Sequence, residues 1–216
     1  MSELTTEIDR LAPDREEIDP ELMELPDPPK GERRLTLVLL LVTALAALAM
    51  VVSLRHDAAY AFAPTASADL GDLRTADAKS FAPNTFAMGR GMLASSQALR
   101  YERPFESDTY RIAPVAGRPN VWVEVRVPAG QEGSRYVPKE NFSGRLIPFS
   151  STGPHHRGLR SAIAAETGMV VTDDAWLLVD GEAPTDSRWA VALFALFSAF
   201  ALWNLVAFFR LARKVS

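Results

Sequence analysis

The chain has 216 residues, with 23 Lys or Arg against 27 Asp or Glu, and a formal net charge of −4. This length allows one folded domain besides any membrane segments, and no basic stripe points to nucleic-acid binding. Because the chain has no cysteine, disulfides, thiolate catalysis, CxxC redox motifs and iron–sulfur ligation by cysteine are excluded.

Residues 1–34 form an acidic segment, with 11 acidic and 5 basic side chains. Five prolines interrupt any helix, so we expect a flexible cytoplasmic tail. In the alternative, short recognition segments fold on a cytoplasmic partner, because apolar side chains recur at helical spacing. The candidate interaction residues are Leu4, Ile8, Leu11, Ile18, Leu22 and Leu25.

Two uncharged apolar runs determine the architecture. They cover residues 35–54 and 189–209, which are 20 and 21 residues long. At about 1.5 Å per residue each helix would cover roughly 30 Å, the thickness of a bilayer's hydrocarbon core. We therefore predict two transmembrane helices. The first run exceeds the roughly 7 to 15 apolar residues of a signal peptide, so we expect an uncleaved anchor.

Basic clusters flank the outer ends of both runs and predict the orientation. The positive-inside rule places both termini in the cytoplasm and residues 55–188 in the periplasm or an equivalent outer compartment. An outer domain without disulfides suits a bacterial inner-membrane protein. The clusters are Lys30, Arg33 and Arg34 before the first run, and Arg210, Arg213 and Lys214 after the second.

Between the two runs we expect a connector (residues 55–85) and then a β-rich domain (residues 86–187). One short helix is expected in the connector, near residues 68–79. In the strongest strand, residues 120–127, valines alternate with Trp122, Glu124 and Arg126. Its apolar face is Val121, Val123, Val125 and Val127. Further strands are expected within 88–99, 107–115, 135–137, 142–149 and 175–179, and a helix over 158–167 with Gly168 as its C-cap.

The fold class expected is therefore two transmembrane helices flanking a small β-rich domain with one short helix. Short strands separated by Gly and Pro turns favour an OB-like, partly closed barrel. The alternative is an open antiparallel sheet with one helix packed on it.

Candidate sites for chemistry are few. His155 and His156 are adjacent, so they do not point at one metal from a helix or strand, and no HxH or HExxH spacing accompanies them. We expect a solvated loop there and no metal. Asp173 and Asp174 are expected in a solvated turn. No phosphate-loop, dinucleotide or nucleophile-elbow motif is found, so we expect no catalytic residues, no cofactor and no enzyme activity.

The apolar runs carry no ionisable residue, which argues against transport and proton relay. Asn204 is the one strongly hydrogen-bonding side chain in the second run. It needs a partner in lipid, either another membrane protein or the chain's own first helix. We therefore include Asn204 among the candidate interaction residues.

The layout resembles that of the Surfeit-locus cytochrome oxidase assembly proteins, which have two spans around a β-rich domain. The resemblance covers topology, domain size and the short exit from residues 176–180 into the second span. The family's Gly, Trp, Gln and basic signature after the first span has no counterpart in residues 55–60, and no haem-binding residues are carried over. The resemblance implies an assembly role.

We expect a non-catalytic accessory or assembly factor of a larger membrane complex, whose partners are the lipid bilayer and other membrane-protein subunits. The alternative is an extracytoplasmic ligand-binding or sensing module that signals through the acidic tail.

Overall fold

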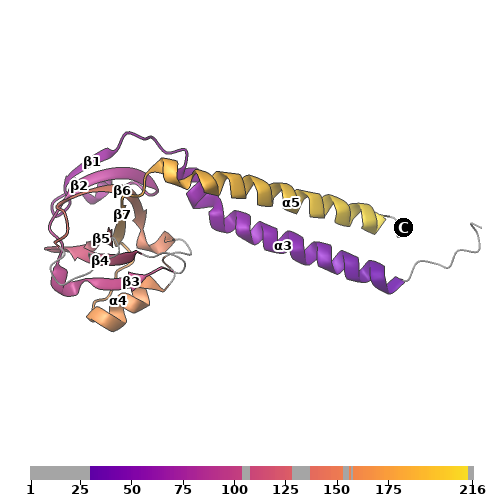
Figure 1. The fold of residues 1–216 in the computed structure, drawn as a ribbon, viewed down its shortest axis with the longest axis horizontal. Helices are drawn as coiled ribbons and strands as arrows, with labels where there is room; N and C mark the ends of the chain where they lie inside the picture. The colour runs from indigo at the N-terminus through magenta and orange to yellow at the C-terminus, as the bar shows by residue number, and fades with distance from the viewer. Residues whose placement is uncertain (1–29, 104–107, 128–136, 153–155, 157, 214–216) are drawn as a thin grey trace, which may run out of the picture.

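The computed structural model describes residues 30–103, 108–127, 137–152, 156 and 158–213. Two long helices lie side by side and project from one end of a sheet domain (Figure 1). The tail with its six candidate residues, His155, and all but Val137 of the strand expected at 135–137 lie outside the described residues.

The two helices are α3 (Lys30–Tyr60) and α5 (Arg188–Arg213). Both are long and apolar enough to cross a membrane, and only 11% of the most apolar stretch of each is buried. That exposure is unlike a core helix of a soluble protein, which is mostly buried. α3 continues six residues past the apolar run, so His56 and Asp57 belong to the helix.

The contact between α3 and α5 is made by small side chains. Ala44 and Ala47 of α3 and Ala190 and Ala201 of α5 are buried. Small residues let two helix backbones approach closely, which drives helix association in lipid. At the opposite end from the domain, the Arg33 side chain donates a hydrogen bond to the Leu211 carbonyl.

The sheet has seven strands in the order β1-β2-β6-β7-β5-β4-β3. The pairs β1–β2 and β5–β7 are parallel and the other pairs are antiparallel. The strands are β1 (Ala68–Asp72), β2 (Thr85–Arg90), β3 (Leu99–Glu102), β4 (Thr109–Val115), β5 (Arg118–Val127), β6 (Asn141–Pro148) and β7 (Trp176–Asp180).

This topology corrects the expectation of an OB-like barrel. Within the described residues β1 and β3 are the two edges and do not pair with each other, so the sheet is open. The sheet is also mixed, not antiparallel, because β7 enters between β5 and β6 and runs parallel to β5.

The prediction of a short helix near residues 68–79 is also wrong. Ala68–Asp72 is the edge strand β1, and only Ala78–Ser80 forms a single 3₁₀ turn. The side chains of Asp69 and Asp72 accept hydrogen bonds from the backbone N–H groups of Gly71 and Arg74, both at 2.9 Å. Such local bonds compete with the helical pattern.

Both faces of the sheet are buried. Val121, Val123 and Val125 lie in the core on one face, and Val127 is also buried, which confirms the predicted apolar face. The core on the other face contains Trp122. The helix α4 (Leu159–Thr167) covers that face through Leu159 and Ile163.

The predicted helix over 158–167 is confirmed within one residue. Gly168 ends α4 in the left-handed region, with φ +69°, and its N–H donates to the Ala164 carbonyl at 3.1 Å. Glycine reaches this conformation without the steric cost that a Cβ brings.

Candidate functional site where the helices meet the sheet

A buried arginine joins the helices to the sheet. Arg145 of β6 donates from Nη1 to Asp57 Oδ1 at 2.7 Å and to Glu182 Oε1 at 3.0 Å. Its Nε donates to Asn84 Oδ1 at 2.8 Å. Asp57 belongs to α3, Asn84 precedes β2, and Glu182 lies between β7 and α5. The side chain thus ties together four separate parts of the chain.

Tyr60, at the end of α3, completes this group. Its hydroxyl donates to the Glu182 carbonyl at 2.7 Å, and the Arg145 guanidinium carbon lies 4.6 Å from its ring centroid. Asn84 Nδ2 also donates to the His56 carbonyl at 3.0 Å. We call Arg145, Asp57, Glu182, Asn84 and Tyr60 the Arg145 cluster. A buried charge that loses its partner is strongly destabilising, so the cluster fixes the sheet domain on the helix ends.

A second ionic group lies deeper in the domain. Glu124 of β5 is 1% exposed, and its Oε2 lies 2.6 Å from His156 Nε2. Arg103 forms an ion pair with Glu124 Oε1, and Arg103 Nη2 is 3.4 Å from His156 Nε2. Tyr101 lies beside Glu124 and Arg103. We call Glu124, Arg103, His156 and Tyr101 the Glu124 cluster.

Electrostatics in the Glu124 cluster favour the ionised carboxylate. Burial alone raises the pKa of Glu124, but its hydrogen bond with His156 and the charges of His156 and Arg103 outweigh burial, so the pKa is lowered. Burial, followed by the negative charge of Glu124, raises the pKa of the Tyr101 hydroxyl. The tyrosine is therefore neutral wherever the protein is folded near neutral pH.

The position of His156 corrects the expectation of a solvated loop. The side chain is 7% exposed and engaged with Glu124, which lies two residues after Trp122 in β5 and therefore on the sheet face that α4 covers. Asp173 and Asp174 do lie in an exposed turn as predicted, where Asp173 accepts from Arg160 at 2.8 Å.

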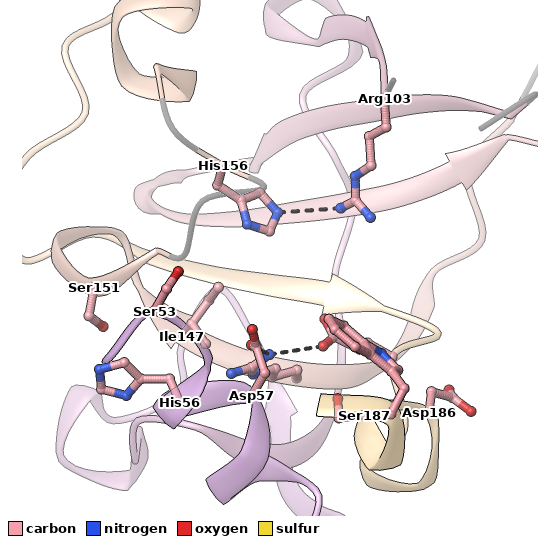
Figure 2. A pocket seen from close by; sticks show the side chains of 12 residues that line it. Ser53, His56, Asp57, Arg103, Ile147, Ser151, His156, Asp186 and Ser187 are labelled. Carbon is pink, nitrogen blue, oxygen red and sulfur yellow. Dashed lines mark hydrogen bonds and ion pairs between the residues drawn. The ribbon is translucent and has the colours of Figure 1, made fainter. Parts of the chain in front are cut away.

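A cavity of about 260 Å³ lies between the two clusters. α3 contributes Ser53, His56 and Asp57 to its wall, and Trp189 of α5 lines it too. Figure 2 shows His156 and Arg103 on one side, with His56 and Asp57 opposite. The cavity thus lies where the apolar parts of both helices end and the domain begins.

The cavity wall contains carboxylates, histidines and serines, which are the residue types that metal binding and nucleophilic catalysis use. Among the described residues no group of three His, Asp or Glu is placed to hold a metal ion. In the same part of the chain no serine hydroxyl is hydrogen-bonded to a histidine; Ser151, which also lines the cavity, donates to the Pro148 carbonyl at 3.4 Å. A nucleophile needs such an oriented base.

Asn204 lies inside the helical hairpin. It is 4% exposed, its Oδ1 accepts from Thr43 Oγ1 at 3.0 Å, and its Nδ2 donates to the Phe200 carbonyl at 2.7 Å. The bond with Thr43 joins the two helices of the chain, which is one of the two alternatives that the sequence left open, while the bond with Phe200 lies within α5. A role of Asn204 in docking on another protein stays a prediction.

The two ionic clusters were not found from the sequence. A usable signal was present, because Glu124 and Arg145 each stand within a strand whose neighbours are apolar. A charge in such a position requires a buried partner. Comparisons with known proteins add nothing further, since no family model, curated protein or solved structure matches the chain.

Proposed function

We propose that this protein is a non-catalytic, two-pass membrane protein that acts as an accessory or assembly factor of a larger membrane complex. The observation that carries the proposal is the Arg145 cluster, which fixes the sheet domain to the end of α3 and to Glu182 in the segment that leads into α5. A domain held in this way presents a constant surface at a constant height above the bilayer, as a docking subunit requires.

Membrane insertion is supported by the exposure of the hairpin. Large apolar side chains such as Leu39, Leu196 and Trp203 are 60%, 61% and 74% exposed. In water this surface would be unfavourable, whereas lipid covers it. The basic clusters at the far ends of the helices favour cytoplasmic termini and a sheet domain on the outer face.

The filled interior of the domain supports a docking role over small-molecule binding. Each face of the sheet is covered by its own hydrophobic core of buried side chains. The cavities that the described residues line have mixed polar and apolar walls, as at Asp69, Arg90 and Ser143 or at Asp72, Arg74 and Glu140. Small-molecule sites are more often deep, apolar and largely pre-formed.

A sensing module is the second candidate function. One observation favours it: the cavity between the two clusters is lined both by the helices and by the domain. An occupant that binds one domain orientation more tightly would shift the hairpin relative to the domain. The acidic tail would then pass this change to a cytoplasmic partner.

Site-specific photo-crosslinking in native membranes tests the accessory role. Probes at Val170, 81% exposed on the domain, and at Trp203, 74% exposed on α5, are expected to capture subunits of one complex. Adding Arg145→Met is expected to abolish the Val170 crosslink and to leave the Trp203 crosslink, because only the domain loses its fixed position. Recovery of the chain alone from both probes contradicts the proposal.

Protease protection tests the orientation separately. An epitope at residue 170 is expected to be accessible from the outer side, and an epitope after residue 216 only after permeabilisation. The opposite pattern contradicts the proposed topology without bearing on the crosslinks.

A further inference from the structure

The cavity between the clusters combines both signs of charge at the level where the apolar helices end. Arg103 and Arg145 line it, as do Asp57, Glu182 and Asp186. Its wall therefore matches a ligand that carries a cation and an anion a few ångströms apart. A ligand with only a negative charge would be repelled by the carboxylates of the wall, and a ligand with only a positive charge would be repelled by the arginines.

The carboxylates at the cavity retain acceptor capacity. Asp57 uses Oδ1 and Glu182 uses Oε1 for the same nitrogen of Arg145. Among the described residues their other oxygens, Oδ2 and Oε2, accept no hydrogen bond. A carboxylate has about four lone-pair sites, so two acceptors remain for a group that donates several N–H bonds.

The surroundings of the cavity point to a lipid. Ser53 and Trp189 line it from the outer ends of the two membrane-spanning helices. Trp189 is 49% exposed, and tryptophan at a span end is typical of the headgroup region. A headgroup entering here would keep its acyl chains beside α3 and α5.

We propose that this cavity binds the headgroup of an ethanolamine phospholipid of the adjacent leaflet. The primary ammonium donates to the free oxygens of Asp57 and Glu182, while the phosphate is stabilised by the guanidinium groups that line the cavity. Choline lacks N–H donors and phosphatidylglycerol lacks the cation, so ethanolamine is the preferred headgroup. The proposal rests on the membrane insertion proposed above.

Native mass spectrometry of the delipidated full-length protein tests the assignment. Phosphatidylethanolamine, phosphatidylcholine and phosphatidylglycerol with identical acyl chains are added in turn, and soluble glycerophosphoethanolamine serves as the chain-free probe. We expect phosphatidylethanolamine to bind at least tenfold more tightly than each of the other three. Equal binding of the choline lipid, preference for the glycerol lipid, or equal binding of the soluble probe overturns the proposal.

A cavity-filling variant separates this site from general lipid contact. Ser53→Trp places a large ring in the cavity and keeps all the charged side chains of its wall, and should lower phosphatidylethanolamine binding at least tenfold. Val52→Trp is the matched control, because Val52 is 57% exposed at the same depth and is absent from the cavity wall. Unchanged binding in Ser53→Trp overturns the proposal.

Glu182→Gln tests the ammonium contact. The variant keeps an acceptor oxygen but removes the charge, so the preference for ethanolamine over choline is expected to fall. An unchanged preference overturns the assignment of the ammonium to this wall. Protease protection on the same reconstituted samples reports insertion independently, so a protein that inserts but shows no headgroup preference refutes this inference alone.

Discussion

Arg145 and Asp57 are 88 residues apart in the chain, yet Arg145 Nη1 lies 2.7 Å from Asp57 Oδ1. One residue is in a strand of the sheet and the other is in the last turns of the first helix. Their ion pair is therefore a direct mechanical link between the domain and the hairpin.

Removing this link should destabilise the protein. Arg145→Met leaves two carboxylates with low exposure, 16% for Asp57 and 28% for Glu182, without their shared cation. We expect a loss of about 3 kcal/mol in the free energy of unfolding, the lower end for a broken buried pair because both carboxylates keep some solvent. Urea unfolding of the detergent-solubilised chain measures it. Arg90→Met at an exposed position is the control and should change stability by less than about 0.5 kcal/mol.

Acid should destabilise the domain through Glu124. Its folded pKa lies below the ordinary value of 4.5, so its contribution to stability is complete above pH 4.5 and is lost as the pH falls through the folded pKa. Unfolding free energies measured from about pH 7 down to about pH 3 should therefore decrease at the acid end. The Glu124→Gln protein should be less stable near neutral pH, and its free energy of unfolding should fall less steeply as the pH is lowered. If the free energy of unfolding of that variant falls equally steeply in acid, the loss of stability comes from groups other than Glu124.

A charge in the valine face should unfold the domain. Val123 is fully buried, and Val123→Asp places a carboxylate in an apolar core with no partner. We expect loss of the cooperative thermal transition. Val170→Asp, at an 81% exposed position, should melt like the unaltered chain. A stable Val123→Asp protein would contradict the burial of this face.

Gly144 should tolerate no larger residue. A Cβ at this position would lie 1.8 Å from the Val179 carbonyl oxygen, where β6 and β7 pair. Gly144→Ala must therefore push the two central strands apart, and we expect a marked fall in melting temperature. In the control Gly91→Ala the nearest atom, Val115 Cγ1, is 3.4 Å away, so the melting temperature should change little. Equal melting of the two variants would contradict the close approach.

The parts of the fold that could be predicted are those whose signals are local. The two long apolar helices follow from the length of the apolar runs, strand β5 from the valine alternation, and α4 from its spacing and its Gly168 cap. β1 was misread because Ala68–Asp72 contains no β-branched or aromatic residue and becomes a strand only through pairing with β2.

The long-range features could not be predicted from one sequence. The entry of β7 between β5 and β6 depends on packing, and pattern analysis gives strands without their order. The Arg145 and Glu124 clusters join residues far apart in the chain, so spacing rules that find motifs within one element do not reach them. His156 was placed in solvent because its partner lies 32 residues earlier in the chain.

The central place of β7 has a consequence for biosynthesis. β7 is the last strand to be made, yet it is the only described strand that joins β1-β2-β6 to β5-β4-β3. A nascent chain that ends before Trp176 has two half-sheets with open edges, which is an aggregation-prone arrangement. Only residues 181–187 separate β7 from α5. The last strand of the sheet and the second apolar helix are therefore synthesised in direct succession, so the domain can reach its final form only when that helix is also being made.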